Sequence, residues 1–125
     1  MRSLLIAGAV AAAAGVMLGA FGAHALKDRL DAGMLAVWQT AVHYHLVHAL
    51  GMVAIGFAAL HWQQASLALA GWLLAAGIVL FSGSLYLLAL TELRWLGAVT
   101  PLGGLAFIAG WLGLAWAASR LPSGG

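Results

Sequence analysis

The amino-acid sequence predicts an all-α protein, an integral membrane four-helix bundle. Of its 125 residues, 65% are hydrophobic and only 6% are charged, a composition that could not cover the surface of a soluble domain of this size. No charged residue occurs between Asp31 and Glu92. Because a membrane-spanning helix needs about 20 apolar residues, we expect about four spans, forming a single transmembrane domain over residues 1–125.

Apolar segments give the expected helices, at about residues 3–24, 34–61, 66–90 and 101–119. Each can cross the hydrocarbon as a helix, which satisfies its own backbone hydrogen bonds. The polar stretches KDRLDAG, HWQQAS and TELRWLGAVTP separate them. Asp31 is placed to cap the second helix, and Thr100 followed by Pro101 is a favourable start for the fourth. The first segment also resembles a signal peptide, but its apolar run is longer than the ~7–15 residues typical of one, so we expect a retained helix.

The few charged residues exclude some partners and weakly favour one orientation. The net charge is +2, without the basic stripe that nucleic acid binding requires. The absence of cysteine removes disulfides and thiolate metal sites. Lys27, Arg29 and Arg94 lie in the first and third connections, whereas Arg2 and Arg120 lie near the termini. The positive-inside rule therefore narrowly favours termini outside the cytoplasm.

Small residues recur at spacings that permit close contact between helices. Gly15 and Gly19 form a G-x-x-x-G pair in the first helix. The third helix carries three glycines that are six residues apart, and the fourth pairs an alanine with each of Gly110 and Gly113 at a spacing of four. Helices in a bilayer associate through close packing of this kind and through polar contacts. We therefore expect a tightly packed bundle that also self-associates.

The second segment interrupts its apolar character with the stretch WQTAVHYHLVHALG, which runs from Trp38 to Gly51. On a helical wheel its polar side chains occupy a broad arc, and an apolar strip lies opposite. That strip consists of Val42, Leu46, Ala49 and Val53. We expect the strip to face lipid and the polar arc to face protein, which would make the second helix the most enclosed.

His43 lies about 12 residues beyond Asp31, which is ~18 Å along the helix and near the bilayer centre. An ionisable side chain at that depth is costly and should have a partner. Other polar residues occupy the same half of the membrane. The expected intramembrane polar cluster consists of His24, Gln39, His43, Tyr44, His45, His48, Ser82, Ser84 and Tyr86.

Three interpretations of this cluster remain open. In the leading one, neutral histidines bind neighbouring helices in a compact structural or interaction module. In the second, the histidines line a proton or small-solute conduit, and so small a unit must then form an oligomer. In the third, they bind haem or a metal, although only His45 and His48 could share an ion and no carboxylate lies at that depth. We expect no cofactor, no metal site and no enzyme activity, because no catalytic triad, carboxylate pair or phosphate loop occurs.

Four motifs together resemble the YgdD-like family of small inner-membrane proteins: GAFGAHALK, WQTAVHYHLVHALG, GIVLFSGSLYLLALT and LGAVTPLGG. The resemblance covers nearly the whole chain in the same order. It implies a multi-pass protein of the bacterial cytoplasmic membrane. Independently of the resemblance, we expect the lipid bilayer and a second copy or another membrane protein as partners. The resemblance implies no activity, because the family is a domain of unknown function. It places in the family pattern His24, Gln39, His43, His45, His48, Ser82, Ser84, Tyr86, Thr100 and Pro101.

Overall fold

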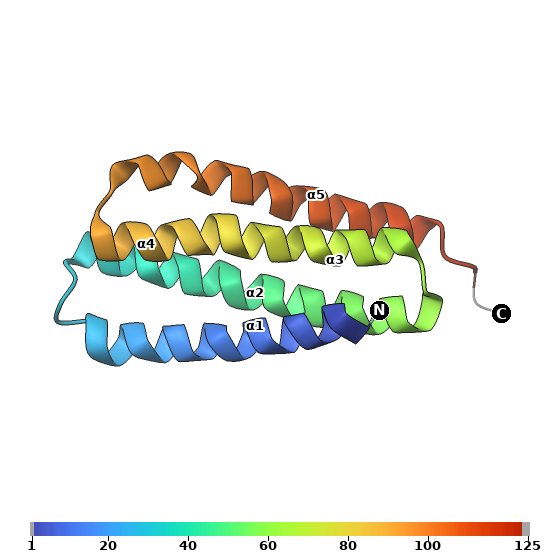
Figure 1. The fold of residues 1–125 in the computed structure, drawn as a ribbon, viewed down its shortest axis with the longest axis horizontal. Coiled ribbons are helices and arrows are strands. Elements are labelled where there is room, and N and C mark those ends of the chain that lie inside the picture. The colour runs from blue at the N-terminus through green and yellow to red at the C-terminus, as the bar shows by residue number, and fades with distance from the viewer. Residues whose placement is uncertain (1, 124–125) are drawn as a thin grey trace.

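The computed structural model describes residues 2–123 as four long helical rods packed side by side (Figure 1). The first rod joins helix α1 (Arg2–Phe21) to a π-helical turn, η1 (Gly22–Leu26), and the second is the single helix α2 (Ala32–Trp62). The third rod runs through α3 (Ala65–Gly77), the π-helical turn η2 (Ile78–Ser82) and α4 (Gly83–Thr91). The fourth joins a 3₁₀ turn, η3 (Arg94–Ala98), to α5 (Thr100–Ser119).

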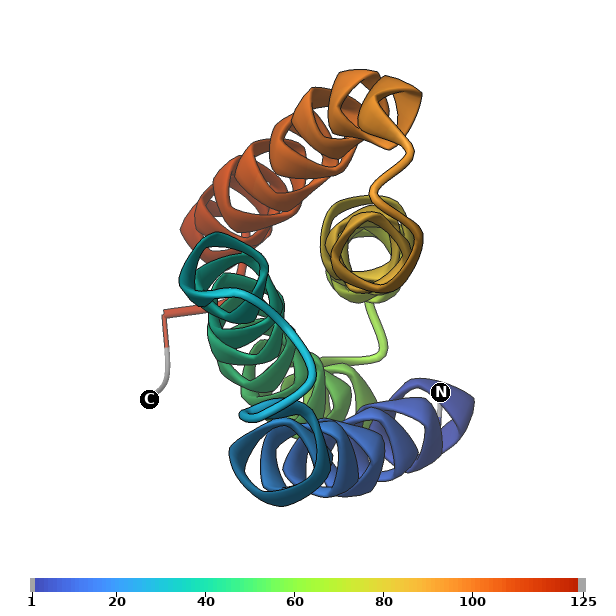
Figure 2. The ribbon, with the colours of Figure 1, turned by 90° about the vertical axis from the view of Figure 1, so that its left-hand side faces the viewer.

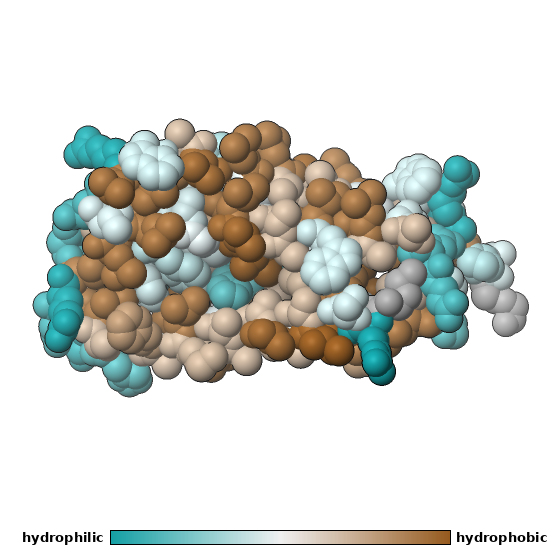
Figure 3. All heavy atoms as spheres, viewed as in Figure 1, coloured by the Kyte–Doolittle hydropathy of each residue, from teal (hydrophilic) through white to brown (hydrophobic). Residues whose placement is uncertain are grey.

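All four rods are long and apolar enough to cross a membrane. They contain 25, 31, 27 and 26 residues, or ~37–46 Å at 1.5 Å per residue, against ~30 Å of hydrocarbon. The face over α3 and α4 is hydrophobic across most of its middle, and hydrophilic side chains gather mainly at its two ends (Figure 3). The predicted fold class, an all-α integral membrane four-helix bundle, is confirmed.

Local sequence signals determine where the rods begin and end. The Asp31 carboxylate accepts a hydrogen bond from the backbone N–H of Met34 at 2.8 Å, which confirms the predicted cap of α2. Gln63 and Glu92, with φ of 52° and 58°, end α2 and α4 in the left-handed conformation. The fourth rod starts at Arg94, ahead of the predicted residue 101, because η3 precedes α5.

Helix α2 lies at the centre of the packing and contacts α1, α3, α4 and η2. In its most apolar stretch 44% of the residues are buried, against 17–33% in the other rods. The prediction that the second helix is the most enclosed is therefore confirmed.

The apolar strip of α2 faces α1 rather than lipid, contrary to the expectation from the helical wheel. A methyl group added to Gly8, Gly15 or Gly19 of α1 would meet side chains of the strip. The strip residues in these contacts are Val53, Leu46 and Val42. The glycine row leaves a shallow groove along α1, and the branched side chains of the strip fill it because apolar packing drives helix association in lipid.

Candidate functional site

The predicted polar cluster separates into a buried set and an exposed set. The side chains of His45, His48, Ser82 and Ser84 are buried, and Tyr86 is partly buried. Exposed on the molecular surface are His24, Gln39, His43 and Tyr44. The two sets have different surroundings and are described in turn.

His45 connects three helices through its two ring nitrogens. Its Nε2 lies 2.8 Å from the carbonyl oxygen of Ala11 in α1, and its Nδ1 lies 2.8 Å from the hydroxyl of Tyr86 in α4. Because a carbonyl can only accept, Nε2 carries the proton, and Nδ1 accepts a hydrogen bond from the tyrosine O–H. A neutral imidazole thus satisfies both contacts and ties α1, α2 and α4 together.

The buried serines make two further links between rods. Ser82 donates to the carbonyl of Ala41 in α2 at 2.7 Å, so η2 is held against α2. Ser84 donates to the carbonyl of Phe81 at 2.9 Å. Its hydroxyl oxygen also lies 2.6 Å from the hydroxyl oxygen of Thr100 in α5, a hydrogen bond in which either group can be the donor. These bonds attach the third rod to both the second and the fourth.

His48 lies against α5 in an aromatic cluster. Its Nδ1–H donates to the carbonyl of Tyr44 at 2.6 Å, one helical turn earlier. Its ring stacks on Phe107, with centroids 3.6 Å apart and planes 12° from parallel. The Tyr44 ring lies parallel to the His48 ring on α2, at 5.9 Å. Among residues 2–123 the Nε2 of His48 has no hydrogen-bond partner.

Trp38 also belongs to the buried network. Its side chain is 2% exposed, and its indole N–H donates to the carbonyl of Leu18 at 2.9 Å. The ring occupies the space that a side chain at Gly22 would fill, and it packs 4.7 Å from Tyr86. The sequence signal was the position of Trp38 within α2, nearly two turns beyond the Asp31 cap.

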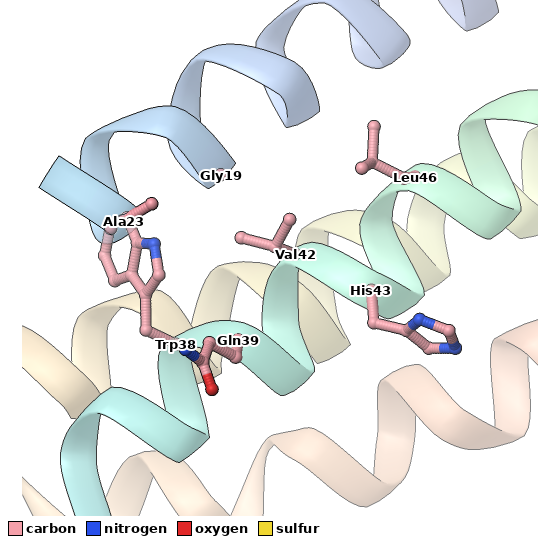
Figure 4. A pocket seen from close by; sticks show the side chains of 8 residues that line it. Gly19, Ala23, Trp38, Gln39, Val42, His43 and Leu46 are labelled. Atoms are coloured by element: carbon pink, nitrogen blue, oxygen red, sulfur yellow. The ribbon is translucent and has the colours of Figure 1, made fainter. Parts of the chain in front are cut away.

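Gln39, Thr40 and His43 are exposed together on the open side of α2, and we call these three residues the polar stripe. Val42 and Leu46 point toward α1, whereas His43 points away from it (Figure 4). Gln39 and His43 border a groove of about 280 Å³ between α1 and α2, whose wall also includes Gly19 and Leu46. Within the described part of the chain, His43 has no hydrogen-bond partner.

The arrangement of the rods explains why the polar stripe is open. The apolar strip, not the polar arc, packs against α1. At the end that carries the first and third connections, the starts of α2 and α5 lie well apart (Figure 2). Neither neighbour therefore covers this part of α2. His24 lies in η1 and is also exposed, and within residues 2–123 no hydrogen bond joins it to His43.

Within residues 2–123, no group of three or more histidine and acidic side chains is placed to hold a metal ion. His45 uses both of its ring nitrogens in helix contacts. The predicted i, i+3 pair of His45 and His48 therefore has only the Nε2 of His48 still open to a ligand. The buried polar set is suited to joining helices, and the polar stripe is suited to contact with something outside the chain.

Comparison with known proteins places these features in a family. A family model described as "Protein of unknown function (DUF423)" matches residues 18–104, which include all nine predicted site residues. UPF0382 membrane protein YwdK of Bacillus subtilis is 50% identical over 121 residues, covering 96% of this chain and 98% of the relative. UPF0382 membrane protein SH2409 of Staphylococcus haemolyticus is 49% identical over 112 residues, covering 90% and 91%. No solved structure matches the chain significantly. With four membrane-length helices and membrane-protein relatives along nearly its whole length, this chain is a membrane protein that belongs to the DUF423 family.

Proposed function

We propose that this protein is a compact interaction module of the bacterial inner membrane that binds another transmembrane helix through the polar stripe of α2. The motifs that resemble the YgdD-like family support the inner-membrane location. The partner is a helix of a second copy or of another membrane protein. We also propose that the module catalyses no reaction and carries no cofactor, since the buried histidine, serine and tyrosine groups serve helix contacts.

One observation carries this proposal: in the middle of the described spans, only α2 exposes amide, imidazole and hydroxyl groups. The exposed side chains in the middle of the other rods are aliphatic, methionine or tryptophan, for example Val16, Val79 and Ile108. An unpaired hydrogen-bonding group costs roughly 4–8 kcal/mol on transfer from water to hydrocarbon. A partner helix that bonds to the stripe removes this cost.

The buried network provides the scaffold for that surface. His45, Ser82 and Thr100 cross-link all four rods near the end where the stripe lies. Interhelical hydrogen bonds of this kind average only ~0.6 kcal/mol each, but several of them fix the rotation of α2 about its own axis. This rotation determines that Gln39 and His43 face outward.

A conduit for protons or small solutes is the second candidate. It is favoured by the Nε2 of His48, which has no hydrogen-bond partner within residues 2–123, and by the exposed ring of His43. In an oligomer such groups could line a path between subunits. Proton or solute flux into liposomes that is abolished by His43→Ala would support the conduit, and equal leakage with and without protein would exclude it.

Photocrosslinking in living cells tests the interaction function. A photoreactive benzophenone amino acid is placed at Val47, an exposed position one turn beyond His43. The matched control is the same amino acid at Val16, on the exposed face of α1. We expect a defined protein adduct from position 47 and only lipid adducts from position 16. Lipid adducts alone from both positions would contradict the proposal.

A further inference from the structure

We propose that the partner is a second copy of this chain, paired with the first in parallel along α2, so that the two His43 side chains meet at the two-fold axis. This inference rests on the proposed function, because it names the helix that the polar stripe binds. Four observations support it. Helix α2 has an exposed seam along its whole length, its polar side chains can each bond to their own copy, and these side chains lie within the hydrocarbon. The G-x-x-x-G pair of α1, which could otherwise join two copies, is already packed against α2.

The exposed side of α2 has the spacing of a helix-pairing seam. Its residues are alternately four and three apart, and each is exposed: Ala36, Thr40, His43, Val47, Leu50, Ala54 and Phe57. This is the 3.5-residue repeat that two helices bury when they pack at a small crossing angle. Leu50 and Phe57 are 63% and 61% exposed, and the seam contains no charged residue, so a second helix can cover its full length.

The polar members of the stripe can each bond to their own copy. A glutamine amide, a threonine hydroxyl and a neutral imidazole all contain one donor and one acceptor at least. Two neutral His43 rings can therefore share a hydrogen bond, in which one N–H donates to the unprotonated nitrogen of the other. A purely donating or accepting side chain, such as lysine or glutamate, could not pair with itself in this way.

The depth of the polar side chains in the membrane favours a parallel over an antiparallel pair of α2 helices. The midpoint of the Ala32–Trp62 span is residue 47, so His43 lies ~6 Å and Gln39 ~12 Å from it, within the hydrocarbon. In a parallel pair each polar group meets its counterpart at the same depth. In an antiparallel pair His43 would lie opposite Leu50 and Ala54, and no bond would form. Copies inserted in the same membrane with the same topology are parallel.

The G-x-x-x-G pair of α1 is not available for this association. A methyl group at Gly15 or Gly19 would meet Leu46 or Val42 of the same chain. The small-residue motif that most often joins two membrane helices is thus occupied inside the bundle. The exposed face of α1 that remains is apolar and suited to lipid, which leaves α2 as the surface that needs a second helix.

Cysteine cross-linking in membranes of expressing cells tests the dimer, and the natural chain contains no cysteine to interfere. Ala54→Cys places a thiol on the seam, in the half that lacks polar groups. Ala13→Cys and Ala109→Cys place thiols on the exposed faces of α1 and α5. Mild oxidation should give a covalent dimer, identified by its mass, from Ala54→Cys alone. Equal yields from all three positions would overturn the proposal.

The role of His43 is tested with two substitutions in the Ala54→Cys background. His43→Leu removes the polar pair, and we expect dimerisation to weaken about threefold or more on dilution with lipid. His43→Gln keeps a donor and an acceptor and should restore most of the yield. Unchanged dimerisation in His43→Leu would overturn the pairing of His43. A protein adduct from Val47 of another mass, without any Ala54→Cys dimer, would leave the interaction function standing and exclude the second copy as partner.

Discussion

His43 and His45 are two residues apart in the chain and have opposite surroundings. His45 bonds to Ala11 and Tyr86 in the interior, whereas His43 faces outward beside a groove. Side chains two residues apart on a helix point in directions that differ by about 200°. One histidine can therefore bond inside the bundle while the other faces outward, where a partner could reach it. The proposed interaction function depends on this division between the two histidines.

The sequence predicted that polar groups would gather in one half of the membrane, but not which of them would be buried. The helical wheel places His43 and His45 correctly relative to each other. It carries no information about which arc of α2 meets α1, because that depends on the glycine groove that receives Val42 and Leu46. The partners of His45 could not be derived for the same reason, since a backbone carbonyl such as that of Ala11 leaves no trace in the sequence.

Tyr86→Phe should destabilise the fold by about 0.6–1.7 kcal/mol, the range for interhelical bonds in membranes. The change removes the O–H that donates to Nδ1 of His45 and leaves that nitrogen buried without a donor. Tyr44→Phe is the matched control, because among residues 2–123 the Tyr44 hydroxyl has no hydrogen-bond partner. Equilibrium unfolding in mixed micelles measures both, and equal effects would contradict the assigned bond.

Between helices, the backbone of η2 approaches α5 closely at Gly103, beside the paired rings of Phe81 and Phe107. A methyl group at Gly103 of α5 would collide with the backbone nitrogen of Phe81 in η2, and one at Gly77 would collide with the Phe107 ring. The sequence predicted glycine-mediated packing in α5, but it emphasised the pairs around Gly110 and Gly113. The π-helical turn that brings Phe81 close to Gly103 has no simple sequence signature, so this contact could not be derived.

Gly103→Ala should destabilise the protein by about 1–3 kcal/mol, the usual cost of forcing an extra carbon into a packed contact. The neighbouring substitution Gly104→Ala is the control, because its nearest heavy atom is the Phe81 Cδ2 at 4.0 Å. The Gly104→Ala substitution should be neutral or slightly stabilising, because alanine has a higher helix propensity than glycine. Both variants can be compared by thermal unfolding in detergent, and equal loss of stability in the two would contradict the close approach of α5 to η2.

For the whole molecule, the number of spans and their order could be predicted from the apolar segments of the sequence. A helix can cross the hydrocarbon only when its apolar run is long enough. The starting end of α1 and the finishing end of α5 lie at the same end of the bundle (Figure 1). The proposed dimer could not be predicted from composition. It depends on which surface of α2 the other rods leave uncovered.

The two chain ends should be accessible from the same side of the membrane, and the positive-inside rule places that side outside the cytoplasm. Single cysteines at Ser3, Ser119 and Asp28 report this with a membrane-impermeant maleimide applied to intact cells. We expect Ser3→Cys and Ser119→Cys to react and Asp28→Cys to react only after the membrane is opened. Labelling of Asp28→Cys in intact cells together with protection of the other two would reverse the orientation. Labelling of only one chain end would contradict four spans.

If a second copy covers the exposed face of α2, as we propose, position 54 of one copy lies close to position 54 of the other. Nitroxide labels on Ala54→Cys, in protein reconstituted at low density in liposomes, report this separation by pulsed dipolar spectroscopy. Packed helix axes lie about 8–10 Å apart, so we predict a short, well-defined label-to-label distance that persists on dilution. In His43→Leu the fraction of molecules at this distance should fall on dilution, in line with dimerisation weakened about threefold or more. A distance distribution that is broad and spreads with every dilution, as for independent monomers, would contradict the dimer.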